Sequence, residues 1–176
     1  QPDTLITPAD LGVTTKVWNA AHAGPVRFQQ ADLNEGYTQR TWTAENLPAT
    51  PGDPYRPDTA VFRPWIDVST LSTWQDVALW YDELSAEQRT VTPRVRQKAA
   101  ALTEGVANPQ EAVQRILSFV ANEINYESIP FLQGAVIPRS ADEVLRDGYG
   151  DCKDKAVLMV ALLEAAGRTD ARVALT

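Results

Sequence analysis

One segment of the chain combines a cysteine with residue types that can activate it. Residues 148–156 have the sequence Gly-Tyr-Gly-Asp-Cys-Lys-Asp-Lys-Ala. Gly148 and Gly150 permit a close approach of the backbone to a helix that we expect to open at Cys152. The free amides and the helix dipole at such a position favour the thiolate, the nucleophilic form of cysteine. The pattern therefore indicates a cysteine nucleophile whose own backbone amide can donate to an oxyanion in acyl transfer.

Two other interpretations of Cys152 stay open. A lone cysteine is often a buried, inert side chain that acts as a small hydrophobe. It is alternatively an exposed, redox-sensing thiol without a resolving partner. The chain has one Cys and one His, so it can form neither an internal disulfide nor a zinc cluster of several Cys and His.

The acidic residues around Cys152 do not predict a metal site. Asp142, Asp147, Asp151 and Asp154 lack the spacing of a calcium loop, and helix capping explains them better. We expect no metal and no cofactor.

Capping signals predict a series of helices from residue 72 onward. Ser72 and Ser140 each open a capping box. Thr92 and Asn108 are each followed by a proline, which favours the first position of a helix. The last helix is expected from about Cys152 to Ala166, ending at Gly167.

The last helix differs from the others in its pattern. Residues 156–163 are apolar on all sides, which predicts a helix buried on most of its faces. Residues 171–175 then predict a buried strand.

The first 70 residues are expected to be β-rich and irregular. Strands are predicted at 26–30, 37–43 and 59–68, the last interrupted at Pro64. The prolines between residues 48 and 64 exclude a helix or a central strand there. The tryptophans either line a peptide or sugar groove or, as we favour, pack the β-region against the first helix; they are residues 18, 42, 65, 74 and 80.

The segments 140–156 and 162–167 resemble the nucleophile segment of the bacterial transglutaminase-like superfamily. In that family a glycine-rich turn ending in Asp-Cys or Ser-Cys opens the core helix, and an Ala-Gly leads into the first strand of an antiparallel sheet. Upstream, Ile124-Asn125-Tyr126 resembles the helix end and the tyrosine before the family's active-site loop. Residues 37–47, 64–70 and 74–84 are similar to a β-rich domain that often precedes these modules, the domain of unknown function 3857 (DUF3857).

The resemblance implies a papain-like site in which Cys152 attacks an amide or a glutamine side chain. A histidine moves the proton, and an aspartate or asparagine orients the histidine. In the family both follow the cysteine, whereas His22 lies upstream and does not match. Gly150, Asp151 and Tyr126 take supporting positions, and by itself the sequence supports Tyr126 as a core tyrosine with a bonded hydroxyl. We therefore expect a fragment of a longer enzyme, inactive or nearly so.

These observations together predict an α+β protein. Residues 1–70 are expected to be the C-terminal part of the DUF3857-like domain with a proline-rich linker. Residues 71–176 are expected to hold the helical half and the first strand of an incomplete transglutaminase-like (papain-like) core. The resemblance implies thiol-dependent acyl transfer or hydrolysis on protein or peptide amides. The alternative is a non-catalytic peptide- or protein-binding module on the same fold.

Charge and hydropathy exclude other classes. The net charge is -7, and no Lys/Arg cluster is present to neutralise phosphates, so we expect no nucleic-acid partner. The longest apolar run, residues 156–163, is too short to cross a bilayer, so we expect no transmembrane segment. The expected partner is a protein or peptide substrate, and the family resemblance leans toward the bacterial periplasm or cell envelope.

Overall fold

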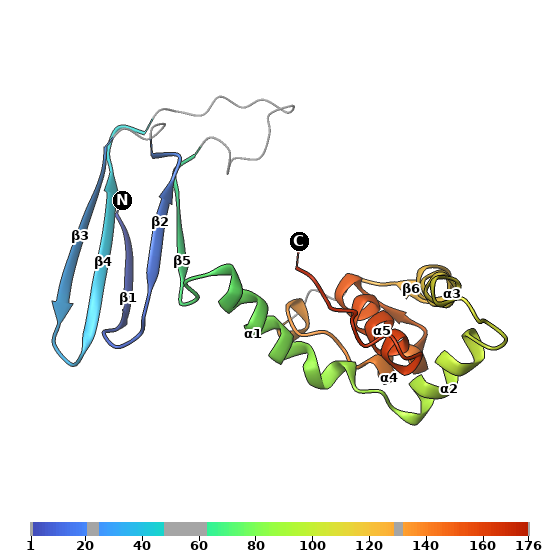
Figure 1. The fold of residues 1–176 in the computed structure, drawn as a ribbon. Helices are drawn as coiled ribbons and strands as arrows, with labels where there is room; N and C mark the ends of the chain where they lie inside the picture. The colour runs from blue at the N-terminus through green and yellow to red at the C-terminus, as the bar shows by residue number, and fades with distance from the viewer. Residues whose placement is uncertain (1, 21–24, 48–62, 129–131, 176) are drawn as a thin grey trace. The chain divides into compact units, whose positions relative to one another are not determined.

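The computed structural model describes residues 2–20, 25–47, 63–128 and 132–175. The chain divides into two compact units, Gln1–Trp74 and Gln75–Thr176. The first unit is built from strands and the second mainly from helices (Figure 1). The predicted α+β class is therefore confirmed.

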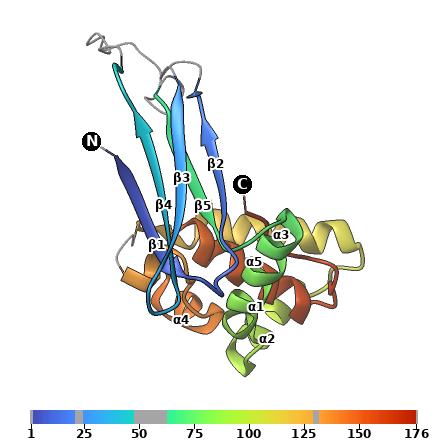
Figure 2. The same ribbon diagram turned by 90° about the vertical axis from the view of Figure 1, so that its left-hand side faces the viewer.

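The first unit contains two antiparallel sheets. One has the strand order β1-β4-β3, and the other pairs β2 with β5 (Figure 2). In the turn between β3 and β4, Glu35 and Gly36 have φ of 72° and 77°, as a tight hairpin requires. The strand bounds are β1 Asp3–Pro8, β2 Thr14–Trp18, β3 Val26–Leu33, β4 Tyr37–Ala44 and β5 Trp65–Ser69.

The strands predicted at 26–30 and 37–43 are confirmed as β3 and β4, each slightly longer than expected. The strand predicted at 59–68 is found only as β5, which begins directly after Pro64, and residues 59–62 lie outside the described residues. Strands β1 and β2 were not predicted from the sequence. Both are short and mostly exposed, so neither carries a clear alternation of apolar and polar residues.

The tryptophans differ in burial. Trp42 is 5% exposed and packs its ring against Phe28, with centroids 5.3 Å apart. The rings of Trp18 and Trp65 stack at 5.7 Å across β2 and β5, and both remain well exposed. Trp74 and Trp80 are exposed as well. Trp42 is therefore buried within the β-rich unit itself, whereas the other four tryptophans keep much of their ring surface in solvent, and packing of the tryptophans against the first helix stays a prediction.

Two helices of the second unit begin where the capping signals at Thr92 and Asn108 predict. The Thr92 side chain accepts a hydrogen bond from the Val95 N–H, and the Asn108 side chain accepts one from the Gln110 N–H. The helix bounds are α1 Trp74–Ala86, α2 Pro93–Leu102, α3 Pro109–Asn122, α4 Ala141–Asp147 and α5 Cys152–Ala165, with short 3₁₀ turns η3 Glu87–Arg89 and η4 Leu132–Ala135.

The predicted capping box at the start of α4 is present. The Ser140 side chain accepts from the Glu143 N–H, and the Glu143 carboxylate accepts from the Ser140 N–H at 3.1 Å and from its hydroxyl at 2.7 Å. These hydrogen bonds from Ser140 are the main cause that lowers the pKa of Glu143. A lowered pKa means that the folded state favours the carboxylate. The stabilisation is therefore complete above the ordinary value of 4.5 and is lost as the pH falls through the folded value.

Ser140→Ala is expected to lower the free energy of unfolding by about 1 kcal/mol at neutral pH, because it removes the hydroxyl that accepts from the Glu143 N–H and donates to the Glu143 carboxylate. The difference from the wild type should shrink in acid, where protonation of Glu143 weakens the box in the wild type as well. Urea unfolding of both proteins at neutral pH and at about pH 3 measures this. An equal loss at both pH values would contradict the role given to Glu143.

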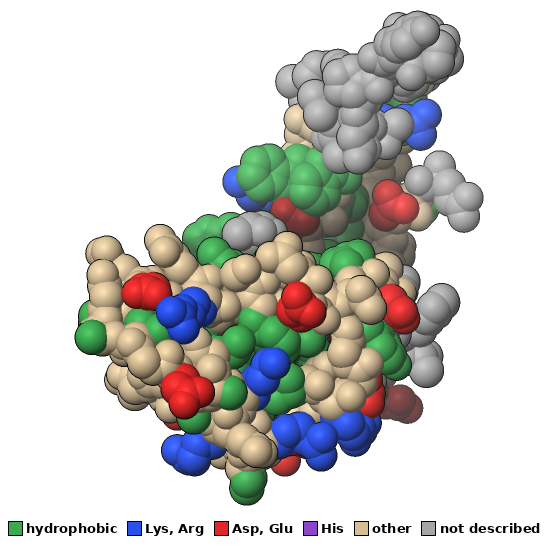
Figure 3. All heavy atoms as spheres, turned by 90° about the vertical axis from the view of Figure 1, so that its right-hand side faces the viewer, with side chains coloured by type: hydrophobic (Ala, Val, Ile, Leu, Met, Phe, Trp, Pro, Cys, Tyr) green, Lys and Arg blue, Asp and Glu red, His purple; other side chains and the backbone are tan. Residues whose placement is uncertain are grey.

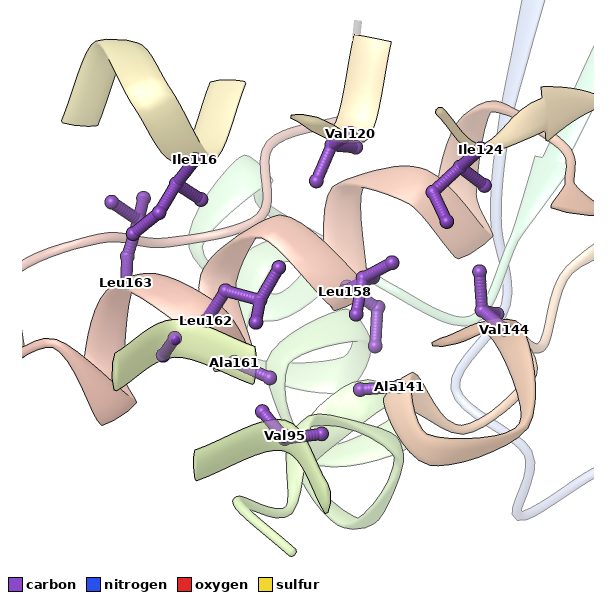
Figure 4. Close-up of a cluster of buried hydrophobic side chains, with 12 residues drawn as sticks. Val95, Ile116, Val120, Ile124, Ala141, Val144, Leu158, Ala161, Leu162 and Leu163 are labelled. Carbon is purple, nitrogen blue, oxygen red and sulfur yellow. The ribbon is translucent and has the colours of Figure 1, made fainter. Parts of the chain in front are cut away.

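The core of the second unit is organised around α5. Leu158 and Leu162 are fully buried, and side chains from the surrounding helices point toward them (Figure 4). Val95 comes from α2, Ile116 from α3 and Val144 from α4, and none of the three is exposed. Burying each such side chain contributes roughly 1.5–3 kcal/mol. The prediction that α5 is buried on most of its faces is confirmed.

The strand predicted at 171–175 is not formed. Ala171 and Val173 pack partly buried against the core, so the expected alternation of side chains is present. However, no strand of the described residues pairs with this segment. A strand needs a neighbour to accept and donate its backbone hydrogen bonds, and this segment therefore remains irregular.

The surface of the helical unit carries charges of both signs. Figure 3 shows basic and acidic side chains in small groups, interspersed with hydrophobic ones, on one face. Arg115 pairs with Glu111 one turn apart on α3, at 2.8 Å. Within the described residues, no helix has the length and apolar character needed to cross a membrane.

Candidate active site

Cys152 is the first residue of α5, and its side chain is exposed. Asp151 precedes it as the N-cap, and the residues of the helix that follow, such as Val157 and Leu158, are fully buried. A rigid, buried helix therefore holds the thiol at the protein surface. The interpretation of Cys152 as a buried core residue is wrong.

The backbone amides at the start of α5 are almost all engaged. The Asp151 N–H donates to Oδ2 of Asp154 at 3.2 Å. The N–H groups of Lys153 and Asp154 donate to Oδ1 of Asp151 at 3.2 and 3.3 Å. The N–H of Cys152 has no acceptor among the described residues. This amide is therefore free to donate to a carbonyl oxygen or an oxyanion that approaches the thiol.

A two-stranded parallel pairing positions the turn before Cys152. Strand β6, Asn125–Tyr126, lies beside β7, Tyr149–Gly150. The Asn125 N–H donates to the Gly148 carbonyl at 2.9 Å, and the Glu127 N–H donates to the Gly150 carbonyl at 3.1 Å. These bonds attach the end of α3 to the glycine-rich turn and fix where α5 starts.

Tyr126 is placed opposite Gly150 by this pairing. Its side chain is 61% exposed, so the prediction of a core tyrosine is wrong. A two-residue strand at the surface has no second layer to cover an outward side chain. Tyr126 therefore lies on the strand beside Gly150, which is two residues before Cys152, and its exposed side chain is accessible to a substrate.

Gly150 is a position where only glycine fits. A Cβ added there would stand 2.7 Å from Cβ of Asp154 and 3.3 Å from Cγ1 of Val144. Gly148 has a different role, because it ends α4 with a φ of 75°, in the left-handed region. The close approach expected of both glycines thus applies to Gly150, and Gly148 provides the turn.

Asp154 joins two segments of the site from a buried position. Its side chain is 1% exposed, and Oδ1 accepts the Arg139 N–H at 2.8 Å while Oδ2 accepts the Asp151 N–H. The loop before α4 is thereby tied to the start of α5. The sequence predicts Asp154 only as a helix cap, because its second bond joins residues 15 positions apart and leaves no local signal.

Arg139 reinforces the same turn with its side chain. Its guanidinium forms an ion pair with Asp147, donates to the Tyr149 carbonyl at 3.3 Å and lies 4.8 Å from the centre of the Tyr149 ring. The turn that carries Gly150 is therefore fixed by two sets of contacts, the pairing of β6 with β7 and the contacts of the Arg139 side chain.

The two lysines that flank Cys152 in sequence are occupied by other partners. Nζ of Lys153 pairs with the Asp151 carboxylate. Nζ of Lys155 donates to the carbonyls of Ala121 and Ile124, at 3.3 and 2.8 Å, at the end of α3. Favourable interactions with a thiolate must therefore come mainly from the helix start and from neighbouring donors.

Tyr81 of α1 is a buried tyrosine, with a side chain that is 5% exposed. Burial raises the pKa of its hydroxyl, Lys153 lowers it, and Cys152 and the carboxylates of Asp151 and Asp154 raise it further. The hydroxyl therefore stays protonated at neutral pH. Sequence periodicity had grouped Tyr81 only with the apolar face of its helix.

The described residues contain neither the histidine of the chain nor a cluster of metal-ligating side chains. His22, the histidine of the chain, lies outside the described residues. Among the residues that the structure describes, no group of three or more His, Cys, Asp or Glu side chains is arranged to hold a metal ion.

The fold and the geometry of this turn agree with a comparison against known families. Residues 96–176 match the Transglutaminase-like superfamily. The matched segment contains α3, α4 and α5 and the whole turn around Cys152. Tyr81 lies outside it.

A solved structure supports the same fold. The chain is similar to a crystal structure from Parabacteroides distasonis ATCC 8503 described as that of a "putative protease", with a TM-score of 0.75 and 23% sequence identity. The similarity covers 94% of this chain and 32% of that chain, so this chain spans about a third of its length. At this identity the likeness shows the fold. No curated protein sequence matches the chain.

Proposed function

We propose that Cys152 is the nucleophile of a thiol-dependent acyl-transfer or hydrolysis reaction on protein or peptide amides. The observation that carries this proposal is the exposed thiol on the first residue of a buried helix, beside its own unbonded N–H. The transglutaminase-like match over residues 96–176 supports it, because it includes this turn.

The proposed reaction begins when the thiolate attacks the substrate carbonyl carbon. A C–S bond forms, and the carbonyl π-electron pair moves onto the oxygen, to which the Cys152 N–H donates. Collapse of this intermediate expels the leaving group and leaves a thioester on Cys152. An amide leaving group must take up a proton as it departs, a role that the family resemblance assigns to a histidine. Attack on the thioester by water gives hydrolysis, and attack by an amine gives cross-linking.

An activated ester tests the nucleophile without the histidine, because p-nitrophenolate leaves as an anion. We expect p-nitrophenyl acetate to release p-nitrophenolate and to add one acetyl group to Cys152, detected by intact mass and peptide mapping. The folded chain should react faster than the same chain unfolded in urea, because only the folded helix start stabilises the thiolate and the oxyanion.

Cys152→Ala should abolish acetylation, since it leaves the chain without a thiol. Cys152→Ser serves as a matched control that keeps a polar side chain and should react far more slowly. If the folded wild type is acetylated no faster than the unfolded chain, the assignment of Cys152 as an activated nucleophile is overturned.

A non-catalytic peptide- or protein-binding module is the second candidate. The observation that favours it is the exposed, stacked pair of Trp18 and Trp65, where Lys16 Nζ lies 3.4 Å from the centre of the Trp18 ring. Exposed aromatic rings are common anchors at binding surfaces. Absence of acetylation at Cys152 in the folded chain would make this the better-supported function.

A further inference from the structure

A cleft with a volume of about 540 Å³ lies in the helical unit. One wall is formed by the end of α1 and by η3, and the other by the end of α5 and the segment that follows it. Because α5 packs against η3, both walls belong to the same packed unit. Sites for small molecules typically have volumes of about 300–1,000 Å³, so the cleft is large enough to hold a ligand.

The cleft is separate from the candidate active site. Glu164 lines it near the C-terminal end of α5, twelve residues after Cys152 on the same helix. At the rise of an α-helix, these two backbone positions are about 18 Å apart. A ligand in the cleft therefore does not contact the thiol.

The lining of the cleft is rich in charged side chains. It includes Asp82, Arg89, Glu164 and Arg172, two of each sign, so their formal charges cancel. Most small-molecule pockets are lined mainly by apolar and aromatic side chains. This lining instead favours a polar ligand that carries charge but has little net charge.

Two of these residues already neutralise each other. Nη2 of Arg89 donates to Oδ1 of Asp82 at 2.8 Å and to its carbonyl at 3.0 Å, and the Arg89 side chain is only 15% exposed. The other guanidinium N–H groups of Arg89 bond to no residue that the structure describes. Since no fully buried side-chain nitrogen in the described part of the chain lacks a partner, these N–H groups are accessible to solvent.

Glu164 and Arg172 have opposite charges that no ion pair among the described residues neutralises. Nη1 of Arg172 donates to the carbonyls of Thr169 and Ala171, at 2.8 and 2.7 Å, which fixes the guanidinium without providing a counter-charge. The Glu164 carboxylate accepts no hydrogen bond from the described residues. The cleft therefore presents an anionic acceptor and a cationic donor that a ligand can engage.

We propose that this cleft binds a small zwitterion, a free amino acid or a short peptide, with its carboxylate on Arg172 and its ammonium on Glu164. A guanidinium matches the geometry of a carboxylate, and an ammonium supplies donors to one. A purely anionic ligand would be repelled by Glu164, and a purely cationic one by Arg172. No reaction at Cys152 is involved, so this inference does not depend on the proposed function.

The probe is the dipeptide alanyl-alanine, compared with its N-acetyl form and its C-terminal amide, each of which lacks one charge. Titrations are followed in amide NMR spectra of the isotope-labelled chain. We expect alanyl-alanine to shift signals from η3 and from residues 164–172. Each blocked form should bind about tenfold more weakly, because it loses one charge-assisted interaction. Parallel titrations with alanine and with tetra-alanine distinguish a free amino acid from a longer peptide.

Two substitutions assign the contacts. Arg172→Gln should bind alanyl-alanine and its amide equally well, while it still discriminates against the N-acetyl form. Glu164→Gln should show the reverse preference. Arg168→Gln is the matched control, since Arg168 pairs with Asp170 at 3.0 Å and does not line the cleft. It should keep both preferences of the wild type.

Each outcome supports or overturns a defined part of the inference. Absence of shifts around the cleft at high millimolar alanyl-alanine would overturn the site. Equal binding of the three probes by the wild type would overturn the recognition of a zwitterion. A preference that survives the substitution assigned to it would overturn the role of that residue. Each preference is a ratio measured within one variant, so a change in the stability of that variant does not affect the conclusion.

Discussion

Gly150→Ala is expected to lower the free energy of unfolding by about 3 kcal/mol and to remove the reactivity that we propose for Cys152. The new Cβ would stand 2.7 Å from Cβ of Asp154, closer than real side-chain contacts allow. Overpacking of a tight interior typically costs 1–3 kcal/mol and occasionally more. We place this site at the upper end because the atom in the way lies next to the backbone of a helix.

The surroundings of Gly150 cannot move aside easily. Asp154 is held by the N–H groups of Arg139 and Asp151, and Val144 is fully buried in the core. Displacing Asp154 would break the capping box that begins next to Cys152. The loss of stability and the loss of thiol reactivity should therefore appear together.

Gly148→Ala is the matched control for this substitution. Nothing lies within 4 Å of a Cβ added at Gly148, but its φ of 75° is unfavourable for alanine. That conformational strain costs about 1–2 kcal/mol. Urea unfolding and iodoacetamide alkylation of both variants should rank Gly150→Ala as the more damaging in each measurement. The opposite order would contradict the close packing of Gly150 on Asp154.

Asp154→Ala is expected to cost about 2–6 kcal/mol, the largest loss from a single polar residue of the site. The change leaves the Arg139 and Asp151 N–H groups without acceptors in a buried setting. Each buried, unsatisfied donor costs about 1–3 kcal/mol, and the bond from the Asp151 N–H is the one that caps α5. The loop before α4 would also lose its tie to the start of α5.

Asp170→Ala provides the comparison at an exposed ion pair. Asp170 pairs with Arg168 at 3.0 Å, and its side chain is 72% exposed. Exposed pairs of this kind contribute little to stability, so this variant should unfold nearly like the wild type. Chemical denaturation of both variants, with an unchanged m-value as the check on two-state behaviour, measures the difference. Similar losses for the two variants would show that Asp154 is not the buried link between these segments.

Much of the helical unit follows from signals that are local in the sequence. The Asn108-Pro109 start of α3 and the Ser140–Glu143 box of α4 each act within one helical turn. A cap needs only residues a few positions apart, so its outcome depends little on the rest of the fold. The same holds for Gly148, whose positive φ ends α4.

Several strands and exposures did not follow from the sequence. The strand expected at 171–175 is absent, because a strand is stabilised by its neighbour and the described residues provide none. Strands β1 and β2 were missed, since short, mostly exposed strands carry little hydrophobic alternation. Tyr126 was expected in the core, and its place on a two-residue surface strand leaves it 61% exposed.

Some features of the candidate site are likewise determined by the local sequence, and others only by the tertiary structure. By itself the sequence determined that Cys152 opens a helix whose later turns are apolar, because capping and hydrophobic periodicity are local properties. Only the tertiary structure decided that β6 pairs with β7 and that Asp154 also accepts the Arg139 N–H. These bonds join residues from different elements, and they are set by how those elements pack. Packing depends on the shapes of many side chains at once, which no short segment of sequence encodes.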